Sequence, residues 1–327
     1  MPRRRSIIAA TLLAAPGMRA ARAQQPAWPA GRPVRVVVGF APGGAGDTIA
    51  RTLAEPLGRE LGATILVDNR PGAGSNIAAE HVARSEPDGY TLLLGGASSH
   101  GVNPALYRRL SFDAVADFTP ITQISDQPLI VAVRADRGIS TLAELGQRMR
   151  AQPGRWNFAS SGTGTPSHLV GVVLGQAMGV EIVHVPFRGG ALALQAVLAG
   201  DVELLVTPPT TALGQIRGGT LRGLTLSSRA NSAVIPEVPG SAAAGLPALD
   251  MDSWWGVWGP ARLPAPIRDR VFAALAAVLA QPGVRTRLAQ EGQQAMPSAS
   301  PEAFDRFIRA GLPVWAEIVR TSGATAE

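Results

Sequence analysis

The sequence contains no cysteine and no lysine, although it has 327 residues and 30 basic side chains. Without cysteine there are no disulfides, thiolate metal sites or cysteine nucleophiles. Without lysine there is no Schiff-base anchor for a cofactor such as pyridoxal phosphate. Aromatic residues make up only 5%, too few for platforms that stack nucleic-acid bases, and the four histidines lack a short metal-ligand spacing. We therefore expect no metal, no cofactor and no nucleic-acid partner.

Positive charge is concentrated at the start of the chain. The formal net charge is +6, but five arginines stand in the first 23 residues, where there is no acidic residue. The remaining chain is close to neutral. All 30 basic residues are arginine, and genomic base composition explains this better than a polyanionic binding partner does.

The first 23 residues have the organisation of an export signal. Three arginines at 3–5 precede an apolar run at 6–15, and the Ala-Arg-Ala of 21–23 fits a small-x-small cleavage site. An ordinary buried helix is the alternative. We predict a signal peptide over 1–23, a mature chain beginning at Gln24, and a periplasmic location, where the absence of thiols suits an oxidising compartment.

The export route stays open, because Arg4-Arg5 also resembles a twin-arginine signal and the Sec route fits equally. No later apolar run reaches the roughly 18 residues that a membrane-spanning helix needs. We therefore expect no direct membrane insertion of the mature chain.

The hydrophobic pattern of the mature chain alternates between strand and helix. Val34–Val38 is a β-branched run, and the helix predicted at 46–61 carries Ile49, Leu53 and Leu57 on one face. Further strands are predicted at 64–67, 90–94, 118–122, 129–133, 156–159, 182–185, 202–206, 221–226 and 254–258, and further helices at 76–84, 141–149, 166–178, 191–199, 266–280, 284–291 and 301–319.

This order predicts an α/β protein of two lobes, each a mostly parallel sheet flanked by helices. The alternation starts afresh near residue 126, and the closing helices need a sheet to cover. We expect residues 24–125 and 228–327 to form a discontinuous first lobe and 126–227 the second. Two hinge crossovers, near 124–130 and 226–256, would join them, as in a ligand binder that closes by hinge motion.

Two loops rich in glycine and hydroxyl groups lie between a predicted strand and a helix. The first is Gly39–Asp47 and the second is Ser160–His168. Free amides at a helix start, together with the helix dipole, favour an anion. A plain βα turn is the alternative for the first loop. A dinucleotide site with Asp68 on the ribose is another, but the glycine spacing is not G-x-G-x-x-G, and no P-loop sequence is present.

Two further loops supply candidate residues. Ser98 and Ser99 follow the strand at 90–94, at the sheet edge where open α/β sheets bind ligands. Phe187 fits the wall of an apolar cleft, and Arg188 is either an anion partner or a solvated loop arginine. His168 is either a ligand residue or a packed helix histidine. The nucleophile elbow G-x-S-x-G is absent, so we expect a binding protein and not an enzyme.

Long runs of the sequence resemble the substrate-binding proteins of tripartite tricarboxylate transporters, the Bug family. They include RPVRVVVGFAPGGAGDTIAR, VDNRPGAGSNIAAEHVARSEPDGYTLLLG, FASSGTGTPSHLVGVVLGQAMG and VPFRGGALALQAVLAGDVELLV. The resemblance covers about residues 28–323. It implies a type II periplasmic-binding fold whose lobes close on a small mono- or dicarboxylate. It also implies that backbone amides, hydroxyls and waters hold the carboxylate, at Phe40, Gly44 and Ala45 in the first loop and at Ser161, Thr163, Thr165 and His168 in the second.

The sequence departs from this family at three places. Many relatives have Tyr-Lys where this chain has Phe187-Arg188, and many have aspartate where it has Thr207. The loss of the aspartate argues against an amino-acid ligand. Gly311 and Pro313 predict a break in the last helix near Leu312.

The function predicted from the sequence is an exported, monomeric solute-binding protein that delivers a small organic acid to membrane transporter subunits. A ligand sensor for a signalling receptor is the second hypothesis, and an exported α/β enzyme is the third. The candidate ligand-binding residues are Phe40, Gly44, Ala45, Ser98, Ser99, Ser161, Thr163, Thr165, His168, Phe187, Arg188 and Thr207.

Overall fold

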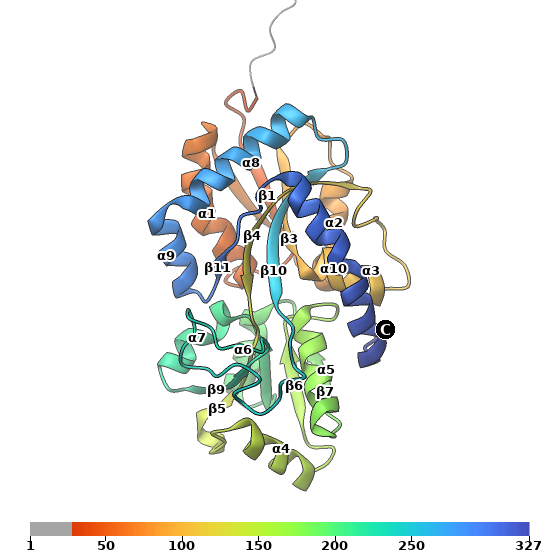
Figure 1. Cartoon of the computed structure of the whole chain (residues 1–327), viewed down its shortest axis with the longest axis vertical. Helices are drawn as coiled ribbons and strands as arrows, with labels where there is room; N and C mark the ends of the chain where they lie inside the picture. Colours follow the sequence, from red (N-terminus) through yellow and green to blue (C-terminus); the bar gives the residue numbers. More distant parts are fainter. Residues whose placement is uncertain (1–27, 327) are drawn as a thin grey trace, which may run out of the picture.

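The computed structural model describes residues 28–326, so the predicted signal peptide lies outside the described residues. Two β-sheets lie one above the other, each flanked by helices (Figure 1). The first sheet has the strand order β11-β4-β10-β3-β1-β2, and the second has the order β7-β6-β8-β5-β9. The first contains β1 (Val34–Val38), β2 (Ile65–Asn69), β3 (Thr91–Gly96), β4 (Phe118–Gln127), β10 (Ser253–Pro260) and β11 (Gln294–Ala295); the second contains β5 (Ile130–Arg134), β6 (Asn157–Ser160), β7 (Val183–Pro186), β8 (Leu204–Thr207) and β9 (Leu221–Leu226).

Most strands of each sheet run in one direction. Strand β1 pairs in parallel with β2 and β3, and β6 pairs in parallel with β7 and β8. Strand β10 is antiparallel to both β3 and β4, so β4 runs in the same direction as β3. Strand β5 is likewise antiparallel to both β8 and β9. The predicted mostly parallel, two-lobed α/β architecture is confirmed.

The helices fall close to the predicted ranges. Helix α5 has the predicted bounds because local signals fix both ends: Thr165 caps it, Pro166 opens it and Gly179 ends it with φ +65°. Helix α7 and the π-helical turn at Ser98–Val102 were not predicted. The α-helices are α1 (Ala45–Leu61), α2 (Asn76–Ala83), α3 (Asn103–Leu106), α4 (Leu142–Ala151), α5 (Pro166–Met178), α6 (Gly190–Ala199), α7 (Pro209–Arg217), α8 (Ala265–Ala280), α9 (Pro282–Gln290) and α10 (Pro301–Ser322), and three short turns are η1 (Ala73–Ser75), η2 (Ser98–Val102) and η3 (Ala135–Arg137).

Both faces of the first sheet are buried, which explains the unbroken apolar runs of its strands. Val36 and Val38 pack with residues of α1 and α8 in one apolar cluster. Val37, between them, points to the opposite face and belongs to the cluster that includes Trp258 and Phe304. This alternation is the period of two that a strand imposes on its side chains.

The predicted break near Leu312 is wrong, because α10 is continuous from Pro301 to Ser322 with Pro313 inside it. Proline removes one backbone hydrogen bond from the helix. Packing compensates: Phe304, Ile308 and Trp315 are buried along one face of α10. The indole of Trp315 lies so close to Gly101 that a Cβ there would stand 2.7 Å from it.

The two crossovers between the sheets are tied to each other by hydrogen bonds. The Ser227 N–H donates to the Leu129 carbonyl (2.8 Å), and the Ser227 hydroxyl accepts from the Leu129 N–H (2.8 Å). The same hydroxyl donates to the Met251 carbonyl at 2.5 Å. The chain therefore passes between the sheets at one place, where β4 leads into β5 and β9 leads back toward β10. The precise residues at which one lobe ends and the other begins stay a prediction.

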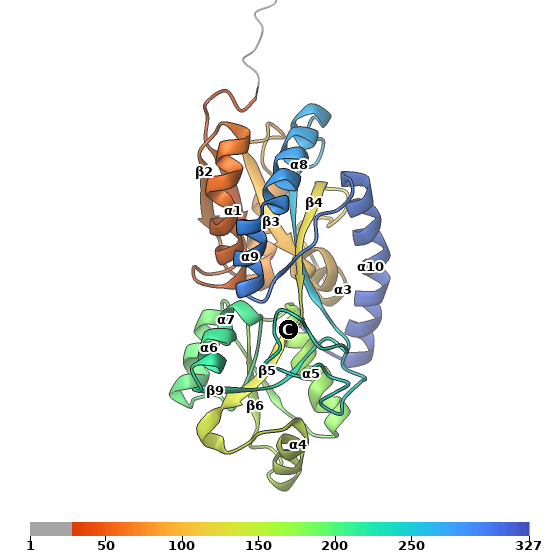
Figure 2. The ribbon, with the colours of Figure 1, turned by 60° about the vertical axis from the view of Figure 1, so that its left-hand side comes forward.

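The two lobes also touch on either side of this hinge (Figure 2). On one side Thr210 of α7 donates its hydroxyl to the Glu291 carbonyl (3.0 Å). On the other, the Gln176 amide of α5 donates to the Ser322 carbonyl at the end of α10 (2.7 Å). The structure therefore shows the lobes in contact.

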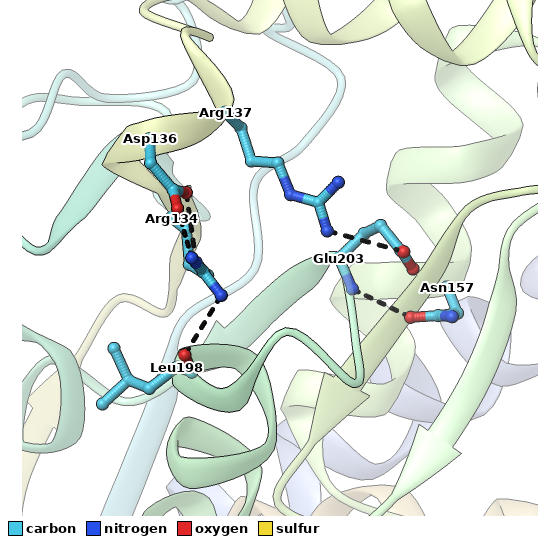
Figure 3. A network of polar contacts seen from close by, with 6 residues as sticks. All are labelled: Arg134, Asp136, Arg137, Asn157, Leu198 and Glu203. Carbon is cyan, nitrogen blue, oxygen red and sulfur yellow. Dashed lines mark hydrogen bonds and ion pairs between the residues drawn. The ribbon is translucent and has the colours of Figure 1, made fainter.

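Polar contacts also stabilise the end of the second lobe away from the hinge (Figure 3). Arg134, at the end of β5, donates to the Leu198 carbonyl of α6 at 3.2 Å. The Glu203 N–H donates to Asn157 of β6 at 3.0 Å, and Arg137 forms an ion pair with Glu203. Among the described residues, no helix has the length and apolar character needed to cross a membrane.

Candidate ligand-binding site

A cleft lies between the two lobes, beside the hinge. Its inner part, a cavity of about 30 Å³, is lined by residues of both lobes, among them Gly44 and Trp255 of the first and Ser161 and Thr211 of the second. An adjoining outer part of about 210 Å³ is lined by Thr163, among others, and shares Phe40 and Ser161 with the inner part. We call these the inner and the outer cavity.

Four helices direct their N-termini at the inner cavity. The lining includes Gly44 before α1, Thr165 before α5, Gly190 at the start of α6 and Pro208 before α7. The first amides of a helix lack intrahelical acceptors, and the helix dipole makes this end electropositive. Four such ends around one small space favour a bound anion.

The first-lobe loop presents its amides without side-chain caps. Gly44 is the N-cap residue of α1 and has no side chain to cap the first amides of the helix. Asp47 accepts from the Gly43 N–H (3.0 Å) and from Arg51 (2.9 Å). Burial raises the pKa of Asp47, but the hydrogen bonds from Arg51, Gly43 and Asn69 outweigh it, so the pKa lies below its ordinary value. The amides of Ala45 and Gly46 remain available to a ligand.

Gly46 is required by packing as well. A Cβ on Gly46 would lie 2.8 Å from the indole ring of Trp255. Trp255 in turn contacts Phe40 edge to face, with 5.6 Å between ring centroids. The first turn of α1 is therefore in direct contact with two aromatic side chains that line the cavity.

The second-lobe loop satisfies its polar groups internally. The Thr165 hydroxyl caps α5 by accepting from the His168 N–H, and it donates to the Gly162 carbonyl at 2.6 Å. The Ser167 hydroxyl accepts from the Ser161 N–H at 3.0 Å. Gly162 has φ +126°, a conformation that strongly favours glycine. The Ser161 hydroxyl has no partner among the described residues and is buried at the cavity wall.

Two stacked histidines support this loop from behind. The rings of His168 and His184 lie 4.0 Å apart and nearly parallel. His184 Nε2 is 2.6 Å from the hydroxyl of Ser160, which also accepts from the Gly162 N–H at 3.1 Å. Burial lowers the pKa of His168 to about 4, and burial together with the charge of His168 lowers that of His184 to about 3. Both rings are therefore neutral at neutral pH.

Nine of the twelve predicted residues line the two cavities. Phe40, Gly44, Ala45, Ser98, Ser161 and Thr165 line the inner one, and Thr163, Phe187 and Arg188 the outer one.

The other three lie behind the lining. Ser99 is fully buried and hydrogen-bonded to His100 (2.9 Å), His168 packs against His184, and Thr207 is buried next to Gly190. His168 therefore occupies the position of a packed helix histidine, the alternative considered for it above.

The rival dinucleotide site has no support in the structure. Asp68 forms ion pairs with Arg70 at 3.0 Å and with Arg35 at 3.4 Å, and it lines neither cavity. This position suits the turn chemistry that its sequence neighbours indicate.

The sequence did not reveal several lining residues. Gln127, Ser253 and Trp255 come from β4 and β10, where they meet because Ser253 pairs with Gln127. Ser75 has φ +77°, which is uncommon for serine, and it lines the outer cavity. An aromatic run and a serine in a turn carry no local sign of such roles.

Five buried polar atoms on the cavity walls have no hydrogen-bond partner among the described residues. They are Ser75 Oγ, Gln127 Nε2, Ser161 Oγ, Thr211 Oγ1 and Trp255 Nε1. A buried polar group without a partner is costly, and at a cavity wall it indicates a ligand position. Within residues 28–326, no charged side chain lines the inner cavity, and Arg188 is the one charged side chain that lines the outer cavity.

The family model of the tripartite tricarboxylate transporter family receptor (TctC) matches residues 49–324. The chain belongs to this receptor family. A curated member, protein BugT from Bordetella pertussis, is 31% identical over 294 residues, which is 90% of this chain and 90% of that protein. Receptors of this family bind solutes, and the fold and the cleft of this TctC receptor agree with that role.

Solved structures place the TctC receptor among periplasmic binding proteins. The periplasmic binding protein BugD superposes with a TM-score of 0.86 at 32% identity, covering 90% of this chain and 98% of that one. A Rhodopseudomonas palustris protein solved with adipate gives 0.87 at 30% identity over 91% and 99%. MatC from the same species, with bound malate, gives 0.83 at 31% identity over 88% and 99%. The resemblance seen in the sequence is confirmed.

Proposed function

We propose that this receptor captures a small dicarboxylate in the cleft between its lobes and delivers it to the membrane subunits of a tripartite transporter. The observation that carries the proposal is the convergence of four helix N-termini on an inner cavity lined by no charged side chain. Amides and hydroxyls can hold a carboxylate by charge-assisted hydrogen bonds without a basic side chain. The adipate and malate of two related structures are ligands of this class.

The cavity lining also argues against an amino-acid ligand. An ammonium group buried in the inner cavity would need an anionic partner, and no aspartate or glutamate lines it. Thr207, which lies next to Gly190 behind the lining, is buried and uncharged.

We propose that the receptor acts in the periplasm. The segment 1–23 would be its export signal, for either the Sec or the twin-arginine route. The receptor would act as a monomer. Closure would couple binding to delivery, because a ligand that contacts both lobes shifts the hinge equilibrium toward the closed state by its difference in affinity for the two states.

A thermal-shift screen of the exported chain tests this function. Mono-, di- and tricarboxylates, aromatic acids, amino acids and nucleotides are compared, with calorimetry on each hit. At a hundredfold excess over its Kd, a ligand of the folded state stabilises it by about 2.7 kcal/mol. We expect dicarboxylates of four to six carbons to stabilise the protein most. Stabilisation by amino acids or nucleotides alone would contradict the proposal.

A further inference from the structure

Two hydrogen-bond donors stand unused beside the hinge, on the wall of the inner cavity. Gln127, at the end of β4, is 2% exposed, and Trp255, on the neighbouring β10, is 6% exposed. Both line the inner cavity, and neither Gln127 Nε2 nor Trp255 Nε1 has an acceptor among the described residues. An indole N–H can only donate, so its partner must be an acceptor.

The orientation of the Gln127 amide is fixed by its neighbour. The Thr210 hydroxyl donates its proton to the Glu291 carbonyl, so it accepts from Gln293 Nε2. The same Nε2 also donates to Gln127 Oε1, while Gln293 Oε1 accepts from the Ser125 hydroxyl at 2.8 Å. Gln127 therefore presents its oxygen to Gln293 and keeps its NH₂ group for another partner. Because the Gln127 oxygen is engaged, the free group is a donor and not an acceptor.

One carboxylate does not use all the donors of the inner cavity. Its two oxygens offer about four lone-pair positions. The amides of Ala45 and Gly46 and the hydroxyls of Ser161 and Thr211 would supply four donors for these positions. The donors from β4 and β10 would then remain buried without a partner, unless the ligand carries a second acceptor.

We infer that Gln127 and Trp255 form a second acceptor subsite, which hydrogen-bonds the second carboxylate of the ligand. The inference rests on the proposed function and deepens it, because it assigns the preference for dicarboxylates to two side chains of the hinge strands. The same glutamine is joined through Gln293 to Thr210 of the second lobe. A ligand on this subsite therefore contacts the hinge itself.

The test compares each dicarboxylate with the monocarboxylate of equal chain length, adipate with hexanoate and succinate with butyrate. Calorimetry gives the preference of the exported chain for the dicarboxylate as a ratio of Kd values. Trp255→Phe keeps an aromatic ring but removes the N–H. Gln127→Glu keeps an oxygen for Gln293 but replaces the free donor by an acceptor. We expect the first to reduce the preference about tenfold and the second to abolish it.

Trp258→Phe serves as the matched control, and Gln293→Met as a second test. Trp258→Phe changes a tryptophan of the same strand that packs on the opposite face, against His100, and the preference should not change. Gln293→Met removes the partner that orients the Gln127 amide without changing a lining residue, so it should also lower the preference for the dicarboxylate. Thermal melts establish that each variant is folded.

The outcomes separate the two proposals. If Trp255→Phe weakens the dicarboxylate and the monocarboxylate equally, or leaves both unchanged, the second subsite is wrong while the proposed function stands. If the wild-type protein binds no dicarboxylate more tightly than its matched monocarboxylate, the dicarboxylate function fails, and this inference fails with it.

Discussion

The loop before α1 and the loop before α5 face the same cavity, and they satisfy their polar groups in different ways. Gly44 leaves the start of α1 without a side-chain cap, whereas Thr165 caps α5 and also donates to Gly162. The first loop therefore offers free amides to a ligand. In the second loop, the hydroxyls of Thr165 and Ser167 form hydrogen bonds within the loop and fix its conformation. The Ser161 hydroxyl has no hydrogen-bond partner among the described residues.

This difference predicts that substitutions in the first loop change ligand affinity alone, whereas substitutions in the second loop change both affinity and stability. In the first loop a side chain can enter the cavity without breaking a hydrogen bond of the fold. In the second, the hydroxyls that shape the loop also stabilise the protein, so their removal affects both quantities.

The largest effect on affinity is expected from Gly44→Val. Gly44 has φ −85° and ψ 174°, which valine adopts readily, and a Cβ there meets only the Ala41 carbonyl, at 3.4 Å. The branched side chain would occupy the inner cavity at the free amides. We expect at least about a 100-fold loss of carboxylate affinity, equivalent to about 2.7 kcal/mol.

Calorimetry and a thermal melt of Gly44→Val measure affinity and stability side by side. The melting temperature should stay within a few degrees of wild type, and Gly44→Ala serves as the milder control. Unchanged affinity would overturn the assignment of the first loop to the ligand.

Thr165→Val should lower both stability and affinity. The variant loses the cap of α5 and the hydrogen bonds to Gly162 and Ser167. We expect a loss of about 1–2 kcal/mol in the free energy of unfolding and about tenfold in affinity.

Thr141→Val is the matched control. Thr141 caps α4 in the same way, by accepting from the Glu144 N–H, but it lines neither cavity. Urea unfolding should show about 1 kcal/mol lost, and carboxylate binding should not change. If both threonine variants bound carboxylate like wild type, the second loop would be a structural turn only.

These loops also show what the sequence could predict. Strand, glycine-hydroxyl loop and helix start are local patterns, so the sequence located both loops and the bounds of α5. Helix α7 was not predicted, because the pair Pro208-Pro209 is typical of a loop, although proline is also favoured in the first turn of a helix.

Other parts of the site depend on tertiary structure alone. Gln127 and Trp255 meet at the cavity only through the pairing of β4 with β10, which nothing local specifies. The family resemblance implied that His168 lies at the ligand, but the ring of this α5 residue packs on His184 of β7. Whether a side chain lines a cavity or supports its wall is decided by packing between distant segments.

The histidines behind the second loop predict a loss of stability between pH 6.5 and 4, above the pH range in which Asp47 of the first loop takes up a proton. The pKa values of His168 and His184 lie at about 4 and about 3 in the folded protein, below the ordinary 6.5. The unfolded chain therefore binds protons that the folded one does not, and stability falls as the pH falls from 6.5 toward 4. Each histidine contributes up to about 1.4 kcal/mol per pH unit in this window.

Urea unfolding between pH 7 and pH 5 measures this slope, above the range in which most carboxylates titrate. Fully buried His100, with a pKa of about 3, adds to it in every variant. His184→Phe retains a ring against Phe158 and His168 but cannot take up a proton. The variant should therefore bind up to one proton fewer on unfolding, and its unfolding free energy should depend less steeply on pH than that of wild type. An unchanged slope would mean that His184 does not titrate differently in the two states.

The smallest effect is expected from Arg51→Met in the first loop. Arg51 donates to Asp47 from the next turn of α1, but its side chain is 59% exposed. Ion pairs of this spacing contribute about 0.3–0.5 kcal/mol when exposed, and Asp47 keeps its hydrogen bond from Gly43 without the arginine. We expect stability within about 0.5 kcal/mol of wild type and affinity within about twofold. A larger loss of affinity would show that the charge of Asp47, once freed from Arg51, repels the bound anion through the first turn of α1, so that the first loop too depends on a side chain.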